Sequence, residues 1–240
     1  MNPQSLKKKI CLVLIISIGL LLIPSLSVFK LLNIHVTNAQ AKPILIACVG
    51  DSITEVTSYT NYLELMLGTN YSIGNFGASG STISLSTYKP YMLQPEFQDA
   101  KIFEPDVVVI MLGTNDAHLD MELSHDAFES DYTLLIDSFQ NLDSTPEVLI
   151  VKSPPVYNNN LGISPTLFSQ NVIPSIIDVA NSQSLALVDV FDMFGNHSDY
   201  MIDGVHPNDA GAMLIASAVF DAIASEETSS LVTDGDSPDY

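Results

Sequence analysis

The chain of 240 residues carries 28 acidic side chains against eight lysines and arginines, which gives a formal net charge of −20. Such a charge repels phosphate backbones and anionic lipid surfaces, so it argues against nucleic acid as a partner. The length suffices for one well-buried α/β domain behind an N-terminal leader and is too short for two.

The first 41 residues have the features of an export segment. Lys7, Lys8 and Lys9 precede an apolar run from Ile10 to Phe29, and Ala39-Gln40-Ala41 offers a small-x-small cleavage site. The apolar run is about as long as a membrane-spanning helix, so a cleaved signal peptide and an uncleaved N-terminal anchor both stay open. Either one predicts that the rest of the chain lies outside the cytoplasm, secreted or anchored to the membrane.

Behind this leader we predict a single domain over residues 42–225 and an acidic, disordered tail over residues 226–240. Cys11 lies in the leader, so cleavage would leave Cys48 alone and no intrachain disulfide would form. Cys48 lies in an apolar run and is expected in the core. Sequons at Asn70 and Asn196 permit glycosylation after export.

From Pro43 onward, short β-branched apolar runs alternate with longer segments of helical spacing. The strands are predicted at Ile44–Val49, Tyr71–Asn75, Val107–Leu112, Val148–Lys152 and Ala186–Val190. The helices are predicted at Tyr59–Leu67, Asp126–Leu142, Thr166–Ser182 and Asn208–Ser225. This order predicts a three-layer α/β/α sandwich around a five-stranded parallel sheet. Ligands bind such sheets beyond the carboxyl ends of the strands, so the residues that follow each strand are the candidates for a site.

The first predicted strand ends in Gly50-Asp51-Ser52, which places a serine hydroxyl at the carboxyl edge of the sheet. A serine needs a neighbouring base before it acts as a nucleophile. Without such a base, Ser52 is explained equally well as the N-cap of the following helix. Asp51 is expected to brace the loop through hydrogen bonds.

Two further strand ends carry neutral hydrogen-bond donors. The second strand runs into Asn75-Phe76-Gly77-Ala78-Ser79-Gly80-Ser81-Thr82, whose small residues let backbone amides approach a ligand closely. The third strand ends in Gly113-Thr114-Asn115-Asp116, and the Asn115 side chain donates hydrogen bonds without titrating. Taken alone, these two segments are also explained as a simple turn and an Asx turn.

The segment Asp203-Gly204-Val205-His206 directly precedes the last predicted helix. A carboxylate three residues before a histidine is able to hold one ring nitrogen while the other faces a serine. This pair would supply a base together with the group that orients it. A metal site and an incidental surface pair are the alternatives, although no further histidine cluster with ligand spacing accompanies the two residues.

Together, these four segments resemble the four sequence blocks of the SGNH (GDSL-type) hydrolase family, and the resemblance extends from about Pro43 to Ser225. It implies a flavodoxin-like α/β/α fold with Ser52 as the nucleophile. Asp203 and His206 would complete the catalytic triad.

The same resemblance implies an oxyanion hole formed by Ser52, Gly80 and Asn115. Gly77 rivals Gly80 for the glycine position, because the loop contains both. We choose Gly80 from its place in Ser-Gly-Ser-Thr. Neither a metal nor an organic cofactor is expected.

The implied reaction is hydrolysis of carboxylic esters through an acyl-enzyme. Gly-Asp-Ser-Ile-Thr and Met-Leu-Gly-Thr-Asn-Asp are most similar to the carbohydrate esterase and sialate O-acetylesterase branch. Short acyl esters, above all acetyl esters on carbohydrates, are therefore the expected substrates. The alternatives are a lipid acyl hydrolase of the lysophospholipase or thioesterase type and a non-catalytic glycan-binding protein. A membrane is expected as a partner only through the N-terminal segment.

Overall fold

The structure, a computed structural model, describes residues 42–122 and 124–233. The predicted leader, residues 1–41, lies outside these ranges, as do residues 234–240 of the predicted tail. No helix within the described ranges combines the length and the apolar character that a membrane span requires.

A single five-stranded sheet forms the middle layer, and all of its neighbouring strands pair in parallel. Its strands are β1 (Ile44–Gly50), β2 (Tyr71–Gly77), β3 (Val107–Met111), β4 (Glu147–Lys152) and β5 (Ala186–Asp189). They lie in the order β2-β1-β3-β4-β5, which is the flavodoxin-like order. The predicted α/β class, the strand number and the parallel sheet are confirmed, and each strand end lies within two residues of its predicted position.

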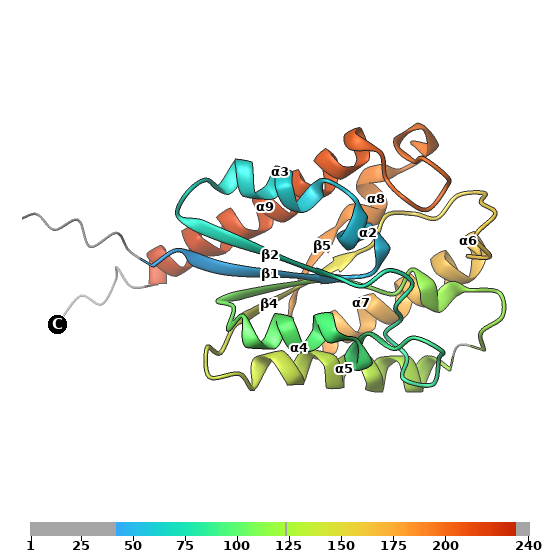
Figure 1. Cartoon of the computed structure of the whole chain (residues 1–240), viewed down its shortest axis with the longest axis horizontal. Coiled ribbons are helices and arrows are strands. Elements are labelled where there is room, and N and C mark those ends of the chain that lie inside the picture. The colour runs from blue at the N-terminus through green and yellow to red at the C-terminus, as the bar shows by residue number, and fades with distance from the viewer. Residues whose placement is uncertain (1–41, 123, 234–240) are drawn as a thin grey trace, which may run out of the picture. The chain divides into compact units, whose positions relative to one another are not determined.

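Helices cover both faces of this sheet (Figure 1). One face carries α3 (Tyr59–Leu67) and α9 (Asp209–Thr233), with the short helices α2 (Ser52–Val56) and α8 (Val190–Phe194) toward the carboxyl ends of the strands. The other face carries α4 (Pro95–Ile102), α5 (His125–Gln140) and α7 (Ile173–Ser182).

Strand β3 shows how the sheet divides the core into two layers. Val108 and Ile110 pack into the cluster on the side of α5 and α7. Val107, Val109 and Met111 pack into the cluster that contains residues of α3 and α9. Because successive side chains of a strand point to opposite faces, a strand covered on both sides must be apolar throughout, as the sequence predicted.

Cys48 of β1 is buried, as predicted, and its thiol is free. Burial raises the pKa of its thiol to about 12, and a hydrogen bond with Tyr59 offsets part of that rise. A thiol held neutral in this way is a small core residue rather than a nucleophile.

Two helix predictions need correction. The segment predicted as one helix over Thr166–Ser182 consists of α6 (Pro165–Leu167), a π-helical turn (Phe168–Val172) and α7. Pro174 has no amide hydrogen for the regular bond four residues back, and such a gap is a common cause of local rewinding. Helix α9 continues to Thr233 instead of ending near Ser225. No glycine or proline lies between these two residues, so the sequence contains no signal that ends the helix.

Candidate active site

Ser52 is the first residue of α2, directly after β1. Asp51, not Ser52, is the N-cap of that helix, because its Oδ1 accepts a hydrogen bond from the Ile53 amide at 2.9 Å. The alternative in which Ser52 caps the helix is therefore wrong. Asp51 braces the turn as predicted and leaves the hydroxyl of Ser52 available for another partner.

That partner is His206, which lies 154 residues further along the chain. Its Nε2 is 2.9 Å from the Ser52 Oγ, and its Nδ1 is 2.7 Å from Asp203 Oδ2. The carboxylate accepts at Nδ1, so Nδ1 carries the proton and Nε2 offers its lone pair to the serine hydroxyl. Serine, histidine and aspartate thus form one continuous chain of hydrogen bonds.

The loop that carries Asp203 and His206 is fixed by its own backbone. Ile202 N donates to His206 O at 2.8 Å and closes the loop. Asp203 Oδ1 accepts from the amides of Val205 and His206 at 3.0 and 2.8 Å. Partial burial raises the pKa of Asp203, but these bonds and the imidazole outweigh it, so its pKa lies below the usual range. The carboxylate stays ionised beside the ring.

The two candidate oxyanion donors, Gly77 at the end of β2 and Gly80 in the loop that follows, differ in their surroundings. The Gly77 amide already donates to Asn75 Oδ1 at 3.0 Å, and a Cβ at Gly77 would overlap the Glu55 backbone. Gly80 lines the cleft at Ser52, has φ +74°, and has no heavy atom within 4 Å of an added Cβ. The structure thus turns Gly80, and not Gly77, toward the cleft.

Asn115 joins the same edge of the sheet from the short helical turn after β3. Its Nδ2 donates to Ser81 O at 3.0 Å, which ties it to the glycine loop. An amide nitrogen has two hydrogens, so one remains for a ligand in the cleft.

All five predicted site residues line one cleft of about 560 Å³. Beside Ser52, Gly80, Asn115, Asp203 and His206, it is lined by Val56, Ser79, Tyr88, His118, Leu161, Ile163, Ile202 and Val205. The sequence did not single out any of these eight as a lining residue. His118 lies three residues beyond Asn115, and its side chain is only a quarter exposed. Tyr157, which follows β4 at the same edge of the sheet, does not line the cleft and donates its hydroxyl to Gly195 O at 3.0 Å.

Two carboxylates are buried behind this cleft. Burial raises the pKa of both Asp51 and Asp116 to about 6. Backbone amides reduce the rise in each case: Ile53 donates to Asp51, and Ile83 and Ser84 donate to Asp116 at 2.9 Å. Both side chains hold loops at the carboxyl edge of the sheet.

One group of described side chains has the spacing of a metal site. The ligand atoms of His125, Glu129 and Asp178 lie within 4.8 Å of one another. None of the three lines the cleft at Ser52. The cleft at Ser52 presents a serine hydroxyl, an imidazole, a carboxylate and a side-chain amide.

Solved structures with related folds include the inhibitor-bound aryl esterase of M. smegmatis, with a TM-score of 0.64 and 18% identity over 76% of this chain and 99% of that one. A carbohydrate acetylesterase from Sinorhizobium meliloti has a TM-score of 0.57 and 19% identity, over 76% of this chain and 99% of that one. An acetyl xylan esterase has a TM-score of 0.59 and 24% identity, over 75% of this chain and all of that one. These similarities establish the fold.

In sequence, the chain is 29% identical over 206 residues to the acetylxylan esterase of Xylanibacter ruminicola. The match covers 75% of this chain and 43% of that protein, so the chain spans less than half the length of this relative. Residues 48–214, which include Ser52, Gly80, Asn115, Asp203 and His206, match the GDSL-like lipase/acylhydrolase family. The chain belongs to the GDSL-like lipase/acylhydrolase family.

Proposed function

We propose that this protein hydrolyses carboxylic esters through an acyl-enzyme on Ser52. The observation that carries the proposal is the bond of 2.9 Å between His206 Nε2 and Ser52 Oγ, with Asp203 bound at the other ring nitrogen. In the first half-reaction, His206 takes the serine proton as Oγ attacks the ester carbonyl, then gives that proton to the departing alcohol. In the second, His206 activates a water that releases the acid and frees Ser52.

The negative oxygen of the tetrahedral intermediate would be bound by three donors. These are the backbone amides of Ser52 and Gly80 and the remaining Nδ2 hydrogen of Asn115. Each preorganised donor of this kind contributes about 3 kcal/mol in the transition state. Such donors would not require a metal ion for the same task.

We propose acetyl esters on carbohydrates as the substrates. The support comes from the names of the relatives, which include an acetylxylan esterase and a carbohydrate acetylesterase. The net charge of −20 supports a soluble or glycan substrate over an anionic lipid surface. We also propose that the enzyme acts outside the cytoplasm, secreted or anchored, and this rests on the sequence of residues 1–41.

A second candidate is a lipid acyl hydrolase, and the rim of the cleft favours it. Val56 is 63% exposed and Ile202 74% exposed, and both line the cleft beside Ser52. Leu161, also at the cleft, is 44% exposed. An apolar rim of this kind is suited to an acyl chain longer than acetyl.

The hydrolysis of p-nitrophenyl esters from acetate to palmitate separates the candidates. We expect kcat/KM to be highest for acetate or butyrate and to be abolished in Ser52→Ala, while Glu64→Gln, an exposed change on α3, keeps full activity. A maximum at long chains would replace the acetyl proposal by the lipid one. A folded wild type that turns over no ester would favour a non-catalytic glycan-binding protein.

A further inference from the structure

A second hollow, of about 290 Å³, adjoins the cleft at Ser52. We call it the Tyr88 hollow and define it by Ser84, Ser86, Thr87, Tyr88, Asp116, Asp120, Met121, Glu122, Ser124 and Ala127. Tyr88 lines both spaces, and Asn115 of the cleft directly precedes Asp116 of the hollow in sequence. The two spaces therefore share Tyr88 as a common wall.

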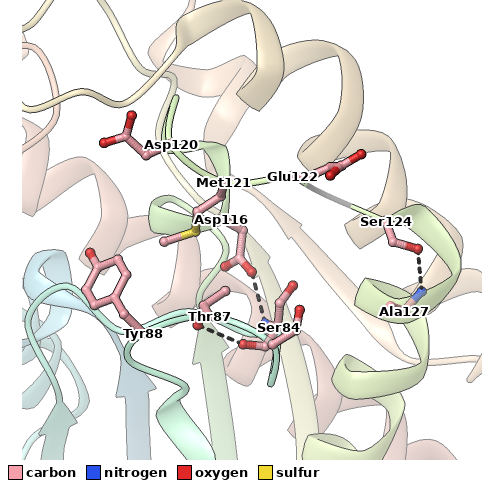
Figure 2. A pocket seen from close by; sticks show the side chains of 10 residues that line it. Ser84, Thr87, Tyr88, Asp116, Asp120, Met121, Glu122, Ser124 and Ala127 are labelled. Carbon is pink, nitrogen blue, oxygen red and sulfur yellow. Dashed lines mark hydrogen bonds between the residues drawn. The ribbon is translucent and has the colours of Figure 1, made fainter.

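Figure 2 shows how the hollow is built. Asp116 lies at its centre above Ser84 and Thr87, with Tyr88 on one side and Ser124 on the other. The carboxylate of Asp116 faces the loop backbone and accepts from the Ser84 amide at 2.9 Å.

The loop that carries Tyr88 is fixed at several points. Its base is closed by two backbone bonds of Thr82, from Thr82 N to Lys89 O at 3.0 Å and from Tyr91 N to Thr82 O at 2.9 Å. Asp131 Oδ2 accepts from the Leu85 amide at 2.7 Å. A wall that is already ordered loses little conformational freedom when a ligand binds.

Tyr88 exposes its ring from this fixed loop. The residue is 72% exposed, and its ring forms no contact with another aromatic ring of the described chain. A tyrosine offers a flat apolar face together with a hydroxyl. The C–H face of a pyranose packs on such a surface while the sugar hydroxyls point away from it.

The lining of the two spaces differs in chemistry. Around Ser52 the cleft presents five aliphatic side chains beside the catalytic groups, among them Ile163, Ile202 and Val205. The Tyr88 hollow presents the hydroxyls of serines and a threonine and the exposed carboxylates of Asp120 and Glu122, while the Asp116 carboxylate is held by the loop amides. Hydroxyls and carboxylates accept hydrogen bonds from sugar hydroxyls, whereas the aliphatic cleft suits an acyl group.

The charges of the residues that line the hollow further restrict which ligand it can bind. Asp116, Asp120 and Glu122 are acids, and none of the described residues that line the hollow is a lysine, arginine or histidine. The side chain of Asp120 is 92% exposed, at the rim of the hollow. Lys89 of the same loop does not line the hollow and donates its ammonium group to Ser79 O at 2.6 Å. His118 of the cleft lies with its Nδ1 3.8 Å from Asp120 Oδ2, so this carboxylate already faces the imidazole. An anionic sugar would meet the Asp120 and Glu122 carboxylates with no lysine or arginine among the residues that line the hollow.

We propose that the Tyr88 hollow binds the alcohol part of the ester and that it selects neutral sugar chains over anionic ones. This inference rests on the proposed esterase function. Tyr88 stacks on the sugar ring next to the one that carries the acetyl group, and the polar side chains bind its hydroxyls. The acetyl group lies against Ser52 in the aliphatic cleft.

The test compares kcat/KM for three acetyl esters: an acetylated xylo-oligosaccharide, O-acetylated sialic acid and p-nitrophenyl acetate. We expect Tyr88→Ala to lower the ratio of the xylo-oligosaccharide to the aryl ester about tenfold or more. Tyr88→Phe keeps the ring and should keep the ratio. Leu65→Ala is the matched control, because it removes an exposed apolar side chain on α3, outside both spaces. It should also leave the ratio unchanged.

Charge selection is tested with Asp120→Lys combined with Glu122→Lys. We expect this pair to shift preference about tenfold or more toward O-acetylated sialic acid, and to do so less at high salt. Glu64→Lys combined with Asp221→Lys adds the same charge at exposed positions outside the hollow. This control pair should change the preference between the two sugars little.

The outcomes separate this inference from the proposed function. If aryl acetate is hydrolysed but the ratio is the same in Tyr88→Ala and wild type, the subsite is overturned and the esterase stands. Equal use of the neutral and anionic sugars by the wild type overturns the charge selection. A folded wild type that hydrolyses none of the three esters overturns the proposed function and the subsite together.

Discussion

Asp203→Asn tests the proposed role of the carboxylate most sharply. The substitution keeps most contacts of the side chain but changes which ring nitrogen of His206 carries the proton. Asp203 Oδ1 accepts from two backbone amides, while Oδ2 accepts from His206 Nδ1. An asparagine that keeps its oxygen on the two amides places its NH₂ group against Nδ1. Nδ1 must then accept, so the ring proton moves to Nε2 and the base can no longer take a proton from Ser52.

The structure also sets the balance between the two orientations of this asparagine. The flipped orientation would restore the bond to Nδ1 but would face two amide hydrogens with an NH₂ group. The flip loses two hydrogen bonds from backbone amides, each worth about 1 kcal/mol, so the unproductive orientation is favoured. We expect kcat to fall about 10⁴-fold, as for the same substitution in a serine protease triad. That corresponds to about 5 kcal/mol of activation free energy.

The assay is p-nitrophenyl acetate hydrolysis, with thermal unfolding of the same preparation. Asp203→Asn should unfold within a few degrees of the wild type, because its two backbone bonds persist. Asp203→Ala is the comparison and should unfold earlier, since it loses all three accepted bonds. A kcat for Asp203→Asn within about tenfold of wild type would refute the tautomer argument.

Three further predictions concern the surroundings of the nucleophile. Gly77→Ala should lower the free energy of unfolding by about 1–3 kcal/mol, because its Cβ overlaps the Glu55 backbone, and chemical denaturation measures this. Gly80→Ala should cost only about 1–2 kcal/mol through its positive φ. If Gly80→Ala proves the more destabilising of the two, our distinction between them is wrong. Asn115→Ala should lower kcat about 10²–10³-fold in steady-state assays with little change in KM, and an unchanged kcat would remove Asn115 from the oxyanion hole. Burial raises the pKa of Asp51 to about 6, so the folded state binds that proton more tightly than the unfolded state and this contribution is lost as the pH rises. The free energy of unfolding of Asp51→Asn, relative to that of the wild type, should therefore rise by about 3 kcal/mol between about pH 4 and pH 7. The same pH dependence of unfolding in both proteins would contradict the raised pKa.

Sequence reasoning placed the sheet because strands buried on both faces are apolar throughout. The long helices α3, α5 and α9 also have buried stripes, such as Phe128, Tyr132 and Ile136 on α5. Helices α2 and α8 have five residues each, too few to show a helical period. Helix α4 buries only Phe97 and Ala100, so its periodic signal is weak.

The site was partly predictable for a similar reason. Asp203 and His206 are close in sequence, and strand ends indicate where Ser52 and Asn115 meet. The choice between Gly77 and Gly80 depends on contacts with Asn75 and Glu55, which no local pattern gives. The Tyr88 hollow was not predictable, because its shape depends on carboxylates from two other segments, Asp116 and Asp131, that fix the loop.

The central claim is that Ser52 becomes covalently acylated by the substrate. The most direct measurement is intact-protein and peptide mass spectrometry after treatment with a fluorophosphonate, which modifies activated serines. Our account predicts one adduct per chain, located on Ser52, with loss of ester hydrolysis in step with labelling and no adduct in Ser52→Ala. A folded, hydrolytically active wild type that takes up no label on Ser52, or a Ser52→Ala variant that keeps full turnover, would contradict it.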